Sequence, residues 1–251
     1  PRVQNAIPLS GFETVRPTYQ FVKGLLDRYD DLIIDSDHMM AISPDEGATE
    51  RAVYLANVLN LDMGMFYKRR DYTRVVNGRN PIVAHEFLGS SVEGKDVIIL
   101  DDMISSGDSI LDVAKQLKSR NAKRIFAAAT FGLFTNGLDK FDEAYESGLI
   151  DGVLTTNLIY QTPELLSRPY YINCDMSKYV ALMIDTLNHD GSISDIWILV
   201  REFRYALRNT RKLTVSYNNC VCSRMPRHSC CEVRVMQLHD ILLLRTSAIL
   251  P

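Results

Sequence analysis

The segment Val97–Ser109 joins an apolar strand to two adjacent carboxylates and a loop of small residues. It reads Val-Ile-Ile-Leu-Asp-Asp-Met-Ile-Ser-Ser-Gly-Asp-Ser, and a helical pattern begins near Ile110. Backbone N–H groups at a helix N-terminus, with hydroxyls beside them, favour a dianionic phosphate. Carboxylates a few residues away suit sugar hydroxyls or a hydrated Mg²⁺. The alternative is that these residues only cap the helix, but the buried strand and paired aspartates in front favour a binding site.

Two other segments carry charges that suit a phosphorylated ligand. Asp45 lies in the segment Ser43–Gly47, which follows an apolar run. This segment is either an ordinary turn or part of a binding site at the end of a strand. Lys68–Arg70 is expected to form a basic loop after another apolar run. Three consecutive cations usually form a solvent-exposed surface without a ligand. Because the rest of the domain is acidic, we infer that these cations bind a polyphosphate. Lysine offers a mobile point charge and arginine a bidentate fork for phosphate oxygens.

These segments are set in an alternation of short apolar runs and helical patterns. Strands are expected at 39–43, 63–67, 81–89, 97–100, 124–131, 152–155 and 170–174, and helices at 18–29, 49–60, 108–120, 138–147 and 177–188. Such alternation predicts βαβ units and therefore an α/β fold with a parallel sheet. Ligands bind at the carboxyl ends of the strands in sheets of this kind.

The composition is that of a globular protein of 251 residues, 46% hydrophobic and 24% charged. Residues 1–196 carry a net charge of −9 and residues 197–251 one of +6. The acidic part argues against nonspecific nucleic-acid binding, which needs a basic face. The sequence has neither an apolar run long enough for a membrane span nor a signal peptide pattern, so we expect a cytoplasmic protein. The single Cys174 of the acidic part fits a reducing compartment.

Val97–Ser109 resembles the phosphoribosyl-diphosphate loop that phosphoribosyltransferases share with ribose-phosphate diphosphokinases. Ser43–Ala52 resembles the Ser-Pro-Asp-x-Gly-Gly segment of the diphosphokinases, and Tyr67–Arg70 matches the Lys-Arg-Arg that opens their flexible catalytic loop. Asn157 lies in Thr-Thr-Asn-Leu-Ile, which is similar to their Val-Thr-Asn-Thr-Ile strand. The resemblance runs from about residue 3 to residue 196, roughly the second half of such an enzyme.

The resemblance implies a phosphoribosyltransferase-like α/β domain, with helices on both faces of a parallel sheet. It implies a Mg²⁺-dependent transfer of diphosphate from ATP to ribose 5-phosphate, which makes 5-phosphoribosyl 1-diphosphate for nucleotide biosynthesis. Lys68 and Arg70 are then catalytic, and Asp45 lies at the metal and ribose site. The residues that would bind ribose 5-phosphate are Asp101, Asp102, Ser105, Ser106, Gly107, Asp108 and Ser109. A homo-oligomer is expected for the full-length enzyme.

The loop departs from the family pattern Asp-Asp-x-x-Asp-Thr-x-Gly-Thr at two positions. Ser105 replaces the third aspartate, and Asp108 stands where the penultimate glycine is expected. A carboxylate near a bound phosphate is unfavourable unless it points away or meets a cation. Two alternatives therefore stay open beside the diphosphokinase, namely a phosphoribosyltransferase and a non-catalytic regulatory paralogue that binds ribose phosphates.

We divide the chain into three parts. Residues 1–36 are interpreted as a remnant or linker from an N-terminal half that carries the ATP-binding loops, so this chain alone is expected to be inactive. Residues 37–196 form the ribose-5-phosphate-binding domain. Residues 197–251 are an atypical tail with four of the five cysteines and an excess of arginine. Its Cys and His residues fit a zinc knuckle poorly, and a shifted reading frame after Ile196 is the preferred hypothesis, with disorder as the alternative.

Overall fold

The computed structural model describes residues 14–70 and 82–192. Its strands are β1 (Met39–Ser43), β2 (Asp62–Arg70), β3 (Ile82–Leu88), β4 (Asp96–Ile104), β5 (Ile125–Gly132), β6 (Gly152–Thr156) and β7 (Tyr171–Cys174). Its helices are α1 (Thr18–Arg28), the 3₁₀ turn η2 (Glu46–Ala48), α2 (Thr49–Leu59), α3 (Asp108–Lys118), α4 (Asp139–Glu146), α5 (Pro163–Leu166) and α6 (Ser177–Asn188). The described residues belong to the first of two units, Pro1–Ser192 and Ile193–Pro251, into which the chain divides.

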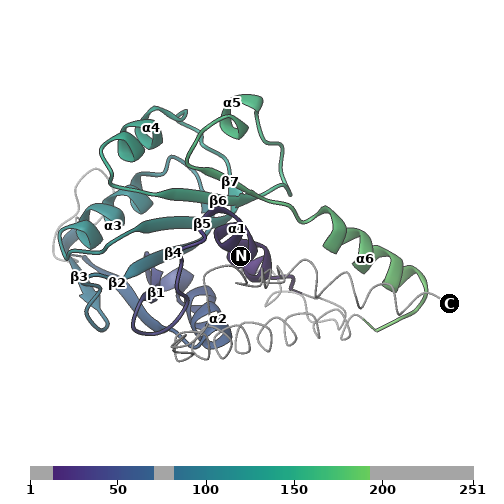
Figure 1. Ribbon diagram of the computed structural model, residues 1–251, viewed down its shortest axis with the longest axis horizontal. Coiled ribbons are helices and arrows are strands. Elements are labelled where there is room, and N and C mark those ends of the chain that lie inside the picture. Colours follow the sequence, from purple (N-terminus) through teal and green to yellow (C-terminus); the bar gives the residue numbers. More distant parts are fainter. Residues whose placement is uncertain (1–13, 71–81, 193–251) are drawn as a thin grey trace, which may run out of the picture. The chain divides into compact units, whose positions relative to one another are not determined.

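The strands form one seven-stranded sheet in the order β3-β2-β1-β4-β5-β6-β7 (Figure 1). All neighbours are parallel except β2 and β3, which pair as an antiparallel hairpin at one edge. From β1 the chain moves outward to β2 in one direction, whereas from β4 it moves to β5 in the other. The order of strands therefore reverses between β1 and β4, which is where ligands bind in open α/β sheets. The predicted α/β fold is confirmed.

Helices cover both faces of the sheet because its central strands are apolar on both sides. Successive strand residues point to opposite faces, so Ile98 and Ile99 are both buried but in different layers. Ile99 belongs to the core that α3 and α4 close with Val113, Leu117 and Phe141. Buried residues of α1 and α2 lie outside that core and cover the opposite face (Figure 1).

The helix α1 lies within residues 1–36, the part interpreted from the sequence as a remnant or linker, and it packs on the sheet. Phe21, Val22 and Leu25 of α1 are at most 3% exposed, and burial of each such side chain contributes about 1.5–3 kcal/mol. A Cβ atom on Gly24 would lie 2.9 Å from Ile172 of β7, so α1 packs closely on the sheet. Residues 18–28 are therefore part of the domain, because their apolar face has its partner in β6 and β7.

Several predicted boundaries move once the strands pair. β4 does not end at Leu100 but continues to Ile104, because it lies between β1 and β5 and pairs with β5 as far as Gly132. α3 begins at Asp108, as predicted, but ends at Lys118 rather than at Arg120. The short helix α5 has no counterpart among the predicted elements, since four residues are too few for a periodic pattern.

The predicted basic loop at Lys68–Arg70 is wrong. These residues are the last three of β2, where Lys68 is in register with His85 and Arg70 with Ile82 of β3. Cross-strand pairing extends the strand past the apolar run that the sequence pattern could detect. The tail, with its zinc and reading-frame hypotheses, lies outside the described residues. No described helix is long and apolar enough to cross a membrane.

Candidate functional site

Three carboxylates come together where the strand order reverses. Asp101 and Asp102 lie near the carboxyl end of β4. Asp45 follows the neighbouring strand β1, and its side chain accepts the backbone N–H of Ala48 at 3.1 Å, which starts the turn η2. The hydroxyl of Ser43 donates to the Asp45 carbonyl at 2.6 Å and fixes the chain as it leaves the sheet. The sequence-predicted residues Asp45, Asp101 and Asp102 therefore lie close together at the switch point of the sheet.

Asp101 lies in surroundings that disfavour its charged form. Its pKa is raised to about 7, chiefly because burial penalises the charged carboxylate. The negative charges of Asp102 and Asp45 raise it further, while the backbone N–H of Asp102, which donates to Asp101 Oδ1 at 2.7 Å, acts in the opposite direction. Perturbed acids of this kind gather at functional sites.

Asp102 is held differently from Asp101. One of its oxygens accepts the backbone N–H of Met103 at 2.9 Å, and the other lies 3.4 Å from the guanidinium of Arg51 on α2. Both side chains of this ion pair are about one-third exposed. Arg51 lies in the segment Ser43–Ala52, which also contains Asp45. The sequence does not predict its ion pair with Asp102, because α2 and β4 meet only in the folded chain.

The loop between β4 and α3 is shaped by Gly107. This glycine precedes α3 with φ of +83°, and a Cβ atom built on it would clash with the ring of Phe141. Glycine is therefore required both by backbone conformation and by the close approach of α4. The loop is tied to the chain beyond β5 as well, since the N–H of Thr135 donates to the Ser105 carbonyl at 3.0 Å. Ser106 is half-buried, whereas Ser105 and Ser109 are exposed.

The carboxylate of Asp108, at the start of α3, has two partners, Ser106 and Lys140. Ser106 Oγ donates to its Oδ2 at 2.8 Å, and the ammonium of Lys140 on α4 lies 2.5 Å from its Oδ1. These two hydrogen bonds, that of Lys140 first, hold the pKa of Asp108 below its ordinary value. The carboxylate that breaks the expected loop pattern is thus charged and paired. Lys140 was not predicted, because nothing in a sequence indicates a contact between residues 32 positions apart.

Lys68 and Arg70, predicted to be catalytic, lie in β2 at the carboxyl ends of the parallel strands, where Asp45 and Asp101 also lie. β1 and β2 are parallel, and Ser43 is in register with Met65. Lys68 follows Met65 by three residues, so β2 carries it about 10 Å further along the strand direction than the end of β1. The backbone of Lys68 and Arg70 therefore extends past the edge at which Asp45 and Asp101 stand.

The donor set suits Mg²⁺ only if the substrate completes it. No cluster of three or more His, Cys, Asp and Glu side chains among the described residues is arranged to hold a metal ion by itself. Mg²⁺ usually binds through one or two carboxylates together with water and substrate phosphates. Asp45 and Asp101 are oxygen donors of this type, and the negative charges of Asp102 and Asp45 add to the burial that raises the pKa of Asp101. The residues therefore fit a metal that binds together with a phosphorylated substrate.

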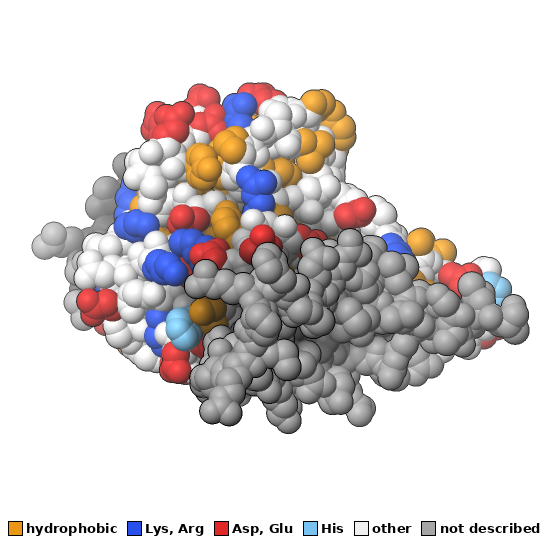
Figure 2. All heavy atoms as spheres, in the orientation of Figure 1, with side chains coloured by type: hydrophobic (Ala, Val, Ile, Leu, Met, Phe, Trp, Pro, Cys, Tyr) orange, Lys and Arg blue, Asp and Glu red, His pale blue; other side chains and the backbone are white. Residues whose placement is uncertain are grey.

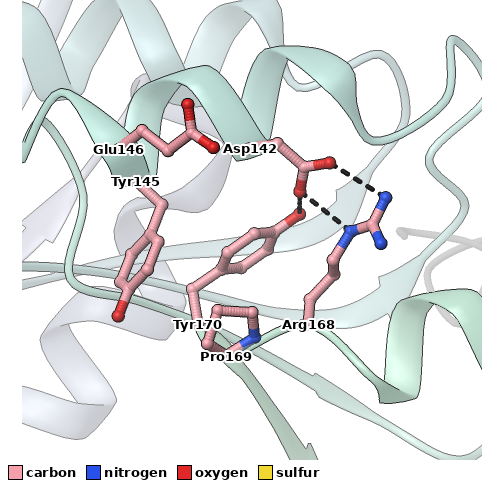
Figure 3. A pocket seen from close by; sticks show the side chains of 6 residues that line it. All are labelled: Asp142, Tyr145, Glu146, Arg168, Pro169 and Tyr170. Atoms are coloured by element: carbon pink, nitrogen blue, oxygen red, sulfur yellow. Dashed lines mark hydrogen bonds and ion pairs between the residues drawn. The ribbon is translucent and has the colours of Figure 1, made fainter.

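A small surface pocket of about 240 Å³ lies elsewhere, between α4 and the start of β7 (Figure 3). Asp142 accepts from Arg168 at 2.9 Å and from the hydroxyl of Tyr170 at 2.7 Å. Burial, followed by the hydrogen bond to Asp142, raises the pKa of Tyr170, so its hydroxyl stays a donor. Arg168 and Tyr170 precede β7 and thus lie at the amino edge of the sheet, so we assign these contacts to stability.

Asn157, which resembles a family residue at the end of β6, has a structural role here. Its Oδ1 accepts the N–H of Met176 at 2.8 Å, and its Nδ2 donates to Asp175 at 2.6 Å and to Ser177 at 2.8 Å. These bonds join the end of β6 to the start of α6. Asn157 therefore fixes the chain at the carboxyl end of β6.

An open parallel sheet with paired acids and a phosphate-type loop at its switch point defines the phosphoribosyltransferase class of domain. Residues 15–157 match the family model described as "Phosphoribosyl transferase domain", and the chain belongs to this family.

Curated relatives narrow the comparison. The chain is 32% identical over 160 residues to the ribose-phosphate pyrophosphokinase (diphosphokinase) of Vibrio parahaemolyticus, which covers 63% of this chain and 48% of that protein. It is 34% identical over 130 residues to the enzyme of the same name from Mycoplasma genitalium, with 51% and 37% coverage. The chain thus spans about half the length, or less, of the curated relatives it matches.

Among solved structures, the fold resembles the phosphoribosylpyrophosphate synthetase of Mycobacterium smegmatis. The TM-score is 0.56 at 22% sequence identity, over 70% of this chain and 52% of that one. At this identity the likeness bears on the fold, and it agrees with the predicted phosphoribosyltransferase-like architecture.

Proposed function

We propose that this chain carries the ribose-5-phosphate half of a ribose-phosphate diphosphokinase. The reaction transfers the β,γ-diphosphate of ATP to the 1-hydroxyl of ribose 5-phosphate and releases AMP. The single observation that carries this proposal is the meeting of Asp45, Asp101 and the loop after β4 at the switch point of the sheet. The names of the curated relatives support the choice of reaction.

The roles proposed for the residues follow from their chemistry. The N–H groups and hydroxyls of Ser105–Ser109 bind the 5-phosphate at the start of α3. Asp101 and Asp102 hold ribose hydroxyls, directly or through Mg²⁺. When bound, Mg²⁺ at Asp45 neutralises charge on the phosphate oxygens. The raised pKa of Asp101 fits this role, since a nearby cation favours the carboxylate form.

Lys68 and Arg70 are proposed to stabilise charge on the transferring diphosphoryl group. Preorganised cations of this kind are worth most where charge develops in the transition state. Their position past the carboxyl edge, on an extended strand, supports this role. ATP as donor, a homo-oligomeric full-length enzyme and a cytoplasmic location belong to the same proposal, and the free, buried Cys174 is consistent with a reducing compartment.

The test is AMP formation by a chain extended to the full length of the relatives. With ATP, ribose 5-phosphate and Mg²⁺, we expect AMP to form, and Lys68→Ala to lower kcat by at least about 100-fold. Asp112→Asn on the exposed surface of α3 is the matched control and should leave kcat unchanged. An unaltered kcat after Lys68→Ala would refute the role of that residue.

The same assay separates the alternatives. A phosphoribosyltransferase would consume 5-phosphoribosyl 1-diphosphate together with a nucleobase and release diphosphate, without forming AMP. A regulatory paralogue would bind ribose 5-phosphate in the extended chain without turnover. The departures at Ser105 and Asp108 are the observations that favour this last alternative. Formation of AMP excludes it.

A further inference from the structure

Lys140 lies at a position that its own helix does not explain. α4 contains Asp139, Asp142, Glu143 and Glu146, and Lys140 is its only cation. Figure 2 shows acidic side chains gathered over this part of the molecule. A cation in the first turn of a helix opposes the helix dipole, which favours acids there. The reason for a lysine at this position therefore lies outside α4.

The partner of Lys140 is in the loop that follows β4. Its ammonium lies 2.5 Å from Asp108, whose second oxygen accepts from Ser106 at 2.8 Å. The next residue on α4, Phe141, is fully buried and packs on Gly107. The first turn of α4 is thus fixed against the loop by a ring, and Lys140 extends from that turn to the carboxylate.

Asp108 poses an electrostatic problem for a phosphate site. Its pKa is lowered, so the carboxylate is charged at neutral pH, one residue before Ser109 and two after Ser106. Two like charges a few ångströms apart repel each other unless a cation lies between or beside them. An unpaired Asp108 would therefore weaken the binding of any anion to this loop.

We propose that Lys140 is a positioning residue of the phosphate loop, which binds and neutralises Asp108 so that the loop can accept the phosphate of ribose 5-phosphate. The proposal rests on the proposed function, because it assumes that this loop binds the 5-phosphate. In this arrangement Lys140 acts through Asp108 and does not contact the phosphate. The Lys140–Asp108 pair compensates for the carboxylate that stands where the family pattern has glycine.

A double-mutant cycle with ribose 5-phosphate as the titrant tests this directly. Lys140→Met keeps the length of the side chain but removes its charge, and we expect it to weaken binding about tenfold when Asp108 is present. In an Asp108→Asn background the same change should weaken binding less than about twofold, because no carboxylate is left to neutralise. Lys140→Arg should restore binding to within about twofold of the parent protein.

The matched control is Lys123→Met, which removes an exposed cation that precedes β5 at the opposite edge of the sheet and whose charge acts on Asp31 instead of Asp108. We expect it to change the dissociation constant less than about twofold. Because all these side chains are exposed, circular dichroism melting should show each variant folded at the temperature of the titration.

Each contrary result has a distinct meaning. Equal weakening by Lys140→Met in both backgrounds would show that Lys140 contacts the ligand directly, and would overturn the positioning role. Binding that is unaffected by Lys140→Met would overturn it as well. If the parent protein binds no ribose 5-phosphate, the proposed function fails together with this inference, whereas a parent that binds normally isolates the failure to Lys140.

Discussion

Asp101 illustrates at the scale of one residue how a binding site stores unfavourable energy. Its carboxylate is largely buried beside Asp102 and Asp45, and its pKa is raised to about 7. The charged form therefore destabilises the folded state in the absence of a cation. A ligand or metal that relieves this repulsion binds more tightly, because its binding removes an unfavourable interaction that lowers the stability of the folded protein.

Replacement of Asp101 by asparagine should therefore stabilise the protein in a pH-dependent way. Below about pH 3 the carboxyl is protonated in both folded and unfolded chains, so the variant and the parent differ little. As the pH rises toward 7 the unfolded chain loses its proton first, and the parent loses stability relative to Asp101→Asn. Above pH 7 we expect a gain of about 2 kcal/mol, which allows for partial solvent screening.

Urea unfolding in EDTA at pH 4.5 and pH 8 measures this gain. The amide oxygen introduced by Asp101→Asn can still accept the N–H of Asp102, so the variant keeps the local hydrogen bond. Asp112→Asn, an exposed change on α3, should show less than about 0.5 kcal/mol at either pH. Equal stability of Asp101→Asn and the parent at pH 8 would contradict the assigned burial.

Gly107 gives a second prediction at the residue scale. Gly107→Ala combines a left-handed backbone with a clash against the ring of Phe141, and it should cost about 2–4 kcal/mol in the free energy of unfolding. Gly137 has a similar φ of +79° but open space around it, so Gly137→Ala should cost only about 1 kcal/mol. Urea unfolding of both variants separates packing from backbone strain. Equal costs would mean that the ring of Phe141 does not press on the loop.

At the scale of elements, the carboxyl and amino ends of the strands have different roles, the first in binding and the second in stability. The carboxyl edge carries Asp45, Asp101 and the loop after β4. The amino edge carries an ion network in which Arg124 binds the buried Asp96 through two hydrogen bonds of 2.9 and 2.7 Å and also contacts Asp31. Asp96 is only 3% exposed, so its charge depends on Arg124 for compensation.

Arg124→Met should accordingly lower stability without affecting the site. The variant leaves Asp96 buried and without this partner, and we expect a loss of about 3 kcal/mol in the free energy of unfolding. Asp31→Asn removes only the exposed partner of the network and should cost less than about 1 kcal/mol. For the folded variant, the dissociation constant of ribose 5-phosphate should stay within about twofold of the parent value. A large change in that constant would show that the two edges are coupled.

For the whole molecule, the sequence predicted most of the α/β alternation, and it singled out Asp45, Asp101 and Asp102, which the fold brings together. Asp45, Asp101 and the loop residues could be found because apolar strands end in polar residues at a shared edge. The pairs Arg51–Asp102 and Lys140–Asp108 could not, since they join segments that meet only through the tertiary fold. The extension of β2 through Lys68–Arg70 was hidden for the same reason, because it depends on pairing with β3.

The central claim is that the switch point of the sheet binds ribose 5-phosphate through its phosphate and its hydroxyls. Calorimetric titration of the 251-residue chain with ribose 5-phosphate in Mg²⁺, beside ribose as the unphosphorylated control, tests it most directly. We predict saturable binding of ribose 5-phosphate, no detectable binding of ribose, and at least about tenfold weaker binding after Asp101→Asn, a variant expected to be more stable than the parent. Absence of binding, or equal binding of both sugars, would contradict the account.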